Sequence, residues 1–128
     1  MNREHRDRLV TQFLAAWTSQ DVDRVLACYT DDVRYHDPNT RGDIIGRDSM
    51  RRYLTRLFAA WKMTWSAREV FDLVGQDGVA LLWRATFVRT GEDKVIEVDG
   101  MDLVVLHGDR VARNEVYFDR TALVHSAA

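Results

Sequence analysis

Residues 94–107, KVIEVDGMDLVVLH, carry the clearest secondary-structure signal in the chain. Alternate residues of a β-strand point to the same side, so this stretch divides into two faces. One face holds a single acid among five small or apolar residues: Ile96, Val98, Gly100, Asp102, Val104 and Leu106. The other face becomes apolar in its second half, at Met101, Leu103 and Val105. We therefore expect a strand that is covered on both sides, with Asp102 in the wall of an apolar interior.

The sequence on either side of this stretch predicts a run of strands joined by short turns. Residues 63–74, 79–90 and 110–118 are rich in β-branched, aliphatic and aromatic residues, as strands are. The segments 75–78, 91–93 and 108–109 between the strands contain glycine and aspartate, which favour turns. Parallel neighbours need crossovers of a dozen or more residues, so these strands are expected to pair antiparallel, as a meander.

The first half of the chain is predicted to be helical. Residues 9–17 have an apolar stripe with helical spacing, and Asp21 can cap a short second helix whose apolar face ends at Tyr29. A third helix follows, with Asp48 or Ser49 as its cap and Trp61 at the end of its apolar stripe. Helices followed by strands indicate an α+β fold, in which N-terminal helices pack on one face of a curved antiparallel sheet.

Length and composition exclude several classes of protein. The chain has 128 residues, which fits one domain spanning residues 1–128. Its formal net charge of -2 argues against nucleic acid as a partner, and no apolar run approaches the roughly 20 residues of a membrane helix. The charged N-terminal residues predict no signal peptide, and the single cysteine, Cys28, suits a reducing cytoplasm.

Several short motifs occur in an order that resembles the nuclear transport factor 2-like superfamily, which includes ketosteroid isomerases, SnoaL-like polyketide cyclases and limonene epoxide hydrolases. The motifs are WTSQDVD at 17–23, YTDDV at 29–33, Asp37-Pro38, Gly46-Arg47 and Tyr117-Phe118-Asp119. The resemblance extends from about Leu9 to about Leu123. It implies a cystatin-like cone, in which a bent antiparallel sheet wraps around helices and encloses an apolar pocket. Both enzymes and binding modules use this fold, so function depends on the pocket residues.

Asp102 is the first candidate catalytic residue. If its face lines the pocket, loss of water around the carboxyl group raises its pKa, and the acid is expected to be neutral near pH 7. A neutral carboxyl group can donate a hydrogen bond to a developing oxyanion, and by resemblance Asp102 matches the acid that does so in steroid isomerases. The alternatives are an ion pair with Arg84 or Arg113, or a reversed assignment of the two faces.

Asp37 is the second candidate catalytic residue. Residues 33–36 alternate like a short strand, and Asp37 shares the face of Val33 and Tyr35, so its side chain is expected to point inward. By resemblance, an acid at this Asp-Pro is the general base that moves a proton at carbon. The alternative is ordinary turn chemistry, because aspartate before proline often begins a loop. One ionised and one neutral acid in one pocket would suit proton transfer at carbon.

The sequence departs from the isomerase pattern at Phe13, which stands where the resemblance places a tyrosine that stabilises the oxyanion. Tyr29 matches a supporting tyrosine, and Tyr53 and Tyr117 are other candidate hydroxyl donors. The epoxide hydrolase pattern fits less well, because its arginine falls at Gly100 and its second acid falls at Val116. The residues predicted to bind a substrate are Phe13, Trp17, Tyr29, Tyr53, Leu54, Trp83, Val116 and Phe118.

These residues lead to one preferred function and three alternatives. We expect a cofactor-independent enzyme that isomerises or cyclises a small apolar cyclic carbonyl compound. A non-catalytic ligand-binding module, a dimerisation domain and, less favoured, an epoxide hydrolase are the alternatives. No metal is expected, since histidine clusters and cysteine pairs are lacking, and no nucleotide cofactor is expected, since glycine-rich phosphate loops are lacking. The apolar outer face of residues 101–105 predicts a homodimer.

Overall fold

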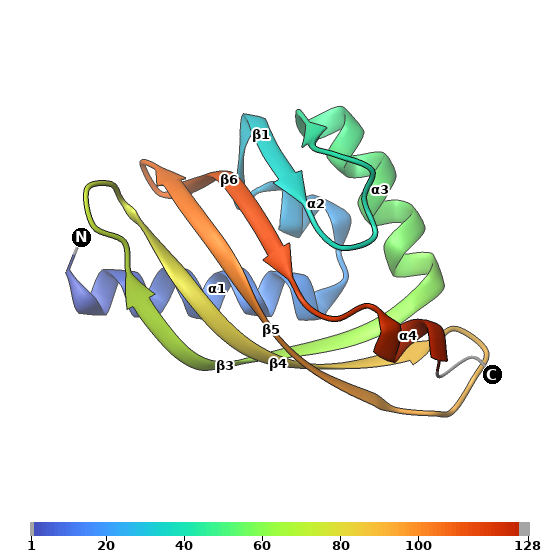
Figure 1. Ribbon diagram of the computed structural model, residues 1–128. Helices are drawn as coiled ribbons and strands as arrows, with labels where there is room; N and C mark the ends of the chain where they lie inside the picture. Colours follow the sequence, from blue (N-terminus) through green and yellow to red (C-terminus); the bar gives the residue numbers. More distant parts are fainter. Residues whose placement is uncertain (1, 126–128) are drawn as a thin grey trace.

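The computed structural model describes residues 2–125 and has helices first and strands second, as the sequence predicts. Helices α1 (Arg3–Ser19) and α2 (Val22–Leu26) precede strand β1 (Tyr29–His36), and the short strand β2 (Ile44–Ile45) precedes α3 (Arg47–Ala60). Four strands follow and a short helix ends the described chain: β3 (Trp61–Asp72), β4 (Gly78–Arg89), β5 (Ile96–His107), β6 (Arg110–Tyr117) and α4 (Thr121–His125). Figure 1 shows the sheet curving across α1, with α3 along one side.

One mixed sheet contains all six strands, in the order β2-β1-β6-β5-β4-β3. Strands β3 to β6 form the predicted antiparallel meander. Strand β1, however, pairs parallel with β6, with Tyr35 opposite Asn114. This pairing was not predicted, since it joins segments that are separated in the chain by α3 and four strands. It has a functional consequence, because it places the end of β1, and therefore Asp37, beside the wall formed by β6.

Helix α1 packs its apolar stripe against the inner face of the sheet, and Val10, Phe13, Leu14 and Trp17 are buried there. Its two ends are well defined. The Asn2 side chain caps the first turn by accepting from the His5 amide (2.8 Å). At the other end the Gln20 side chain donates to the Trp61 carbonyl (3.0 Å) and accepts from the Met63 amide (2.5 Å), which ties α1 to β3.

Three predicted helix ends were wrong. Tyr29 begins β1 and does not extend the second helix, and Trp61 begins β3 and does not end the third. The third helix is capped by Gly46 instead of Asp48 or Ser49. Gly46 has a φ of 86° and its amide donates to the Val33 carbonyl (2.8 Å), a conformation that glycine adopts readily.

The two faces of β5 are as predicted. Val98, Asp102 and Val104 are buried on the inner face, while Met101, Leu103 and Val105 are half-buried on the outer face. Within residues 2–125, every helix is too short or too polar to cross a membrane.

Candidate active site

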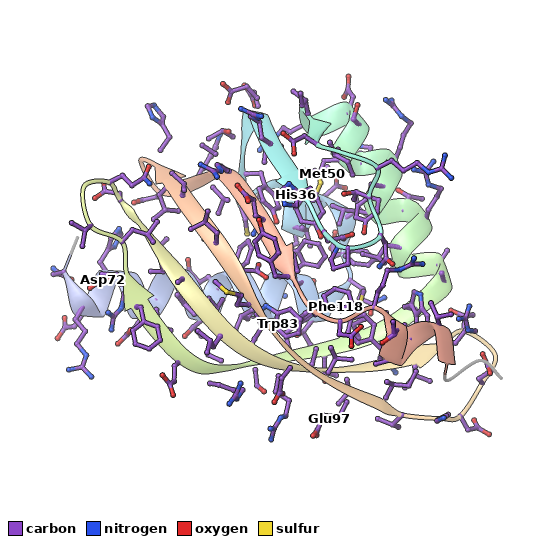
Figure 2. The ribbon with its side chains drawn as sticks, in the orientation of Figure 1. His36, Met50, Asp72, Trp83, Glu97 and Phe118 are labelled. Carbon is purple, nitrogen blue, oxygen red and sulfur yellow. The ribbon has the colours of Figure 1, made fainter. Side chains whose placement is uncertain are left out.

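An apolar pocket lies between α1, α3 and the inner face of the sheet, and both candidate acids are in its wall. The free volume of this pocket is about 30 Å³, room for about two water molecules. Aromatic side chains make up much of the pocket lining. Trp83 and Phe118, for example, meet edge to face with ring centres 6.0 Å apart (Figure 2). The lining residues are Phe13, Leu14, Trp17, Tyr35, Asp37, Asn39, Leu57, Met63, Trp65, Trp83, Phe87, Asp102, Val116 and Phe118.

Asp102 is 6% exposed and makes no ion pair with any residue that the structure describes. The Trp83 indole donates to its Oδ1 (2.7 Å), and the Asn114 amide donates to its Oδ2 (3.1 Å). The alternative that Asp102 pairs with Arg84 or Arg113 is therefore wrong. These arginines lie on the outer face, where Arg84 binds Asp99 (2.8 Å) and Arg113 binds Glu115.

Burial raises the pKa of Asp102 from 3.8 to about 6, and the negative charge of Asp37 adds to the increase. The hydrogen bonds from Asn114 and Trp83 act in the opposite direction, since they stabilise the carboxylate. The direction of the shift was predicted, but its size is smaller than full neutralisation requires. At pH 7 about a tenth of the molecules carry a neutral Asp102 when the pocket is empty.

A chain of hydrogen bonds continues from Asp102 toward α1. The Tyr29 hydroxyl donates to Asn114 Oδ1 (2.7 Å) and accepts from the Trp17 indole (3.2 Å). Tyr29 is fully buried, and burial raises the pKa of its hydroxyl well above the ordinary value, so it remains a neutral donor. Tyr29 therefore orients Asn114 and, through it, Asp102.

Asp37 follows β1 directly and is 8% exposed. Its Oδ2 accepts from the Tyr35 hydroxyl (2.7 Å) and from the Tyr53 hydroxyl, while its Oδ1 accepts from the Asn39 amide (2.7 Å). Burial, followed by the charge of Asp37, raises the pKa of both tyrosines, so both hydroxyls stay protonated. Asp37 therefore organises the turn, and its carboxyl group points inward to the pocket wall, as predicted.

Comparison with protein families identifies the family of this chain. The model of the SnoaL-like domain matches residues 10–114, most of the chain. The chain belongs to the SnoaL-like domain family. This confirms the predicted membership of the nuclear transport factor 2-like superfamily. A search of the curated proteins found no significant match.

Solved structures confirm the fold of this SnoaL-like domain. A nuclear transport factor 2-like protein of unknown function from Burkholderia pseudomallei has a TM-score of 0.82 at 17% identity, covering 98% of this chain and 97% of that one. A ketosteroid isomerase-like protein from Catenulispora acidiphila, in complex with trimethylamine, has a TM-score of 0.81 at 17% identity, over 91% and 89%. The epoxide hydrolase/cyclase-like enzyme SalBIII of salinomycin pyran ring formation has a TM-score of 0.81 at 17% identity, over 94% and 95%.

Five of the eight residues predicted to bind a substrate line the pocket of the SnoaL-like domain: Phe13, Trp17, Trp83, Val116 and Phe118. Tyr29 and Leu54 are buried behind the wall, and Tyr53 contributes its hydroxyl to Asp37. The candidate hydroxyl of Tyr117 lies on the outer face, beside His36 and Glu115.

The prediction missed several lining residues of the SnoaL-like domain, among them Met63 and Phe87. The period-2 pattern could have found them, since Met63 and Trp65 alternate on β3 and Trp83 and Phe87 share the inner face of β4. No group of three histidine, cysteine, aspartate or glutamate side chains in residues 2–125 is placed to hold a metal ion.

Proposed function

We propose that residues 1–128 form one domain that catalyses proton transfer at carbon in an apolar cyclic carbonyl compound, without a cofactor, as an isomerase or polyketide cyclase. One observation carries this proposal: two buried carboxyl groups with unlike partners share the wall of one apolar pocket. Asp37 accepts hydrogen bonds from hydroxyl and amide donors, whereas Asp102 accepts from an indole and a side-chain amide, and burial raises its pKa.

In the proposed mechanism Asp37 removes a proton from the carbon next to the substrate carbonyl. The electron pair of that C–H bond forms the C=C bond of an enolate, and the carbonyl oxygen takes the negative charge. Neutral Asp102 donates a hydrogen bond to this oxygen. The bound ring excludes water from Asp102, and this further desolvation favours the neutral form that the mechanism needs. Returning the proton from Asp37 to another carbon gives isomerisation. In cyclisation the enolate carbon attacks a second carbonyl carbon, the electron pair of that C=O π bond moves to its oxygen, and the resulting alkoxide takes the proton from Asp37.

Phe13 supports the second candidate function, a binding module without catalysis. Its ring lines the pocket but has no hydroxyl, and the Tyr29 hydroxyl is already committed to Asn114. Oxyanion stabilisation in the proposed enzyme therefore depends on Asp102, and each missing donor typically costs about a hundredfold to a thousandfold in rate.

Hydrogen–deuterium exchange separates the two candidates. The protein is incubated in deuterium oxide with enolisable cyclic ketones, and deuterium uptake by the ketone is followed by mass spectrometry. We expect uptake by wild type and by the surface control Asp93→Asn, and loss of uptake in Asp37→Asn. Ketone binding is measured in parallel by tryptophan fluorescence, since Trp17, Trp65 and Trp83 line the pocket. Binding without uptake in wild type would favour the binding module and refute the enzyme.

We also propose that the protein is a homodimer and that it works in the cytoplasm. Met101, Leu103 and Val105 form a half-buried apolar row on the outer face of β5, a surface that a second copy of the chain could cover. The single cysteine fits a reducing compartment.

A further inference from the structure

A second, wider hollow adjoins the pocket, and we call it the vestibule. The free volume of the vestibule is about 610 Å³, far larger than that of the pocket. Its walls come from the turn after β1, from α3, from the neighbouring ends of β3 and β4, and from α4, which lies near the C-terminal end of α3 in Figure 1. Asn39 and Leu57 line both hollows, and the vestibule residue Tyr53 donates its hydroxyl to Asp37. A molecule in the vestibule would therefore lie next to Asp37.

The charged residues that line the vestibule are all positive. Four arginines line it, Arg41, Arg56, Arg89 and Arg120, and the residues that line it include no aspartate or glutamate within the described chain. One of the four, Arg89, forms an ion pair, with Glu92 (3.1 Å). The chain as a whole has a net charge of -2, so this concentration of positive charge departs from its average composition.

The positions of the arginines suit an anionic group that stays outside the pocket. Arg41 and Arg56 are exposed, and Arg120 donates to Asn39 Oδ1 (3.1 Å), where vestibule and pocket meet. Arg89 lies over the Trp61 ring, 4.4 Å from its centre. Guanidinium groups bind carboxylates through paired, planar hydrogen bonds. The pocket beyond is apolar, so charge and ring would be recognised in separate places.

We propose that the vestibule binds a carboxylate of the substrate, so that the preferred substrates are cyclic or aromatic ketones that carry an acid group. The ketone reaches Asp37 and Asp102 when the aromatic side chains that line the narrow pocket move aside, while the carboxylate remains among the arginines. This proposal rests on the proposed function for the identity of the reacting group, but the charge preference can be measured independently.

Two small ketones of equal shape test the proposal: 4-acetylbenzoate, which is anionic, and 4-acetylbenzamide, which is neutral. Both have an enolisable acetyl group. Binding is measured by tryptophan fluorescence, and deuterium uptake by mass spectrometry. We expect wild type to bind the carboxylate more tightly than the amide. The ratio of the two affinities should fall roughly two- to fivefold in Arg56→Gln and again in Arg120→Gln, as for exposed ion pairs. It should also fall as the ionic strength rises from about 0.01 M to about 1 M.

Arg52→Gln is the matched control. Arg52 lies on the same helix as Arg56, is exposed, and donates to the Ser49 side chain outside the vestibule (3.1 Å). It should leave the ratio unchanged, which separates a local effect from a change of net charge. Equal binding of the two ketones, an equal loss of ratio in Arg52→Gln, or no saturable binding of the carboxylate would overturn the vestibule proposal.

The two proposals fail in different ways. Deuterium uptake without charge preference would overturn the vestibule proposal and leave the proposed enzyme. Arginine-dependent preference for the carboxylate without uptake would overturn the enzyme and support the vestibule as the anion site of a binding protein.

Discussion

Replacing Asp102 with asparagine should change how protein stability depends on pH. The folded-state pKa of Asp102 is about 6, against 3.8 for an unperturbed aspartate. The folded state therefore binds a proton more tightly than the unfolded state. The resulting stabilisation is fully present below about pH 3.8 and is lost as the pH rises through about 6. The difference between these two pKa values corresponds to about 3 kcal/mol in the free energy of unfolding.

Asparagine cannot ionise, so the variant lacks this loss. Its amide can accept from only one of the two donors, Trp83 and Asn114, and the misplaced second donor costs about 1–3 kcal/mol at every pH. We therefore expect Asp102→Asn to be less stable than wild type at pH 3.5. The difference should shift by about 3 kcal/mol in favour of the variant by pH 7.

Urea unfolding followed by tryptophan fluorescence provides the measurement, at half-unit pH intervals from 3.5 to about 7.5. Taking the difference between the two proteins cancels the other titrating groups. Asp99→Asn is a suitable control, because Asp99 is exposed and its ion pair with Arg84 lowers its pKa. A difference between Asp102→Asn and wild type that does not vary with pH would refute the argument that burial perturbs Asp102.

Three further predictions follow from the same geometry. If neutral Asp102 donates to the oxyanion, kcat/KM for deuterium exchange should fall about tenfold per pH unit above about pH 6; a rate that rises through pH 6 would mean that Asp102 acts as a base. Gly100→Ala should destabilise the fold by about 1–3 kcal/mol in urea unfolding, because the new Cβ would lie 2.5 Å from the Trp83 ring and 2.6 Å from the Tyr117 carbonyl; wild-type stability would contradict this packing. Leu103→Lys should convert the proposed dimer to a monomer in sedimentation, and a monomeric wild type would refute the dimer.

The sequence predicts the parts of this fold in which one face of a strand is buried. The inner face of β5 could be assigned because a shift of one residue would bring Glu97 and Asp99, which are exposed, among the core residues in place of Val98 and Gly100. The parallel pairing of β1 with β6 has no local signal, since it depends on how α3 and the meander bring distant segments together. Gly100 illustrates the same limit: its place on the inner face was predicted, but its contact with Trp83 requires the β4–β5 register.

The partners of the two acids lie beyond sequence reasoning for a related physical reason. Asn114 reaches Asp102 diagonally across the β5–β6 pair, in which Asp102 is opposite Val116. The predicted burial of Asp102 therefore gave the direction of its pKa shift. It did not reveal the opposing hydrogen bonds, which hold the pKa at about 6. The tyrosine donors of Asp37 come from β1 and α3, two elements that no local sequence pattern brings together.

The charge of Asp37 and the protonation of Asp102 are coupled in the pocket. The charge of Asp37 helps to raise the pKa of Asp102, so an ionised Asp37 favours the neutral donor that the mechanism needs. In the proposed mechanism Asp37 takes a proton from carbon, so its negative charge disappears and an equal charge forms on the substrate oxygen beside Asp102. The pocket therefore holds one negative charge before and after the step, and the charge only moves from one wall to the other. Since moving a charge within a buried site avoids a further desolvation cost, pairing one charged and one neutral acid suits a pocket that is apolar elsewhere.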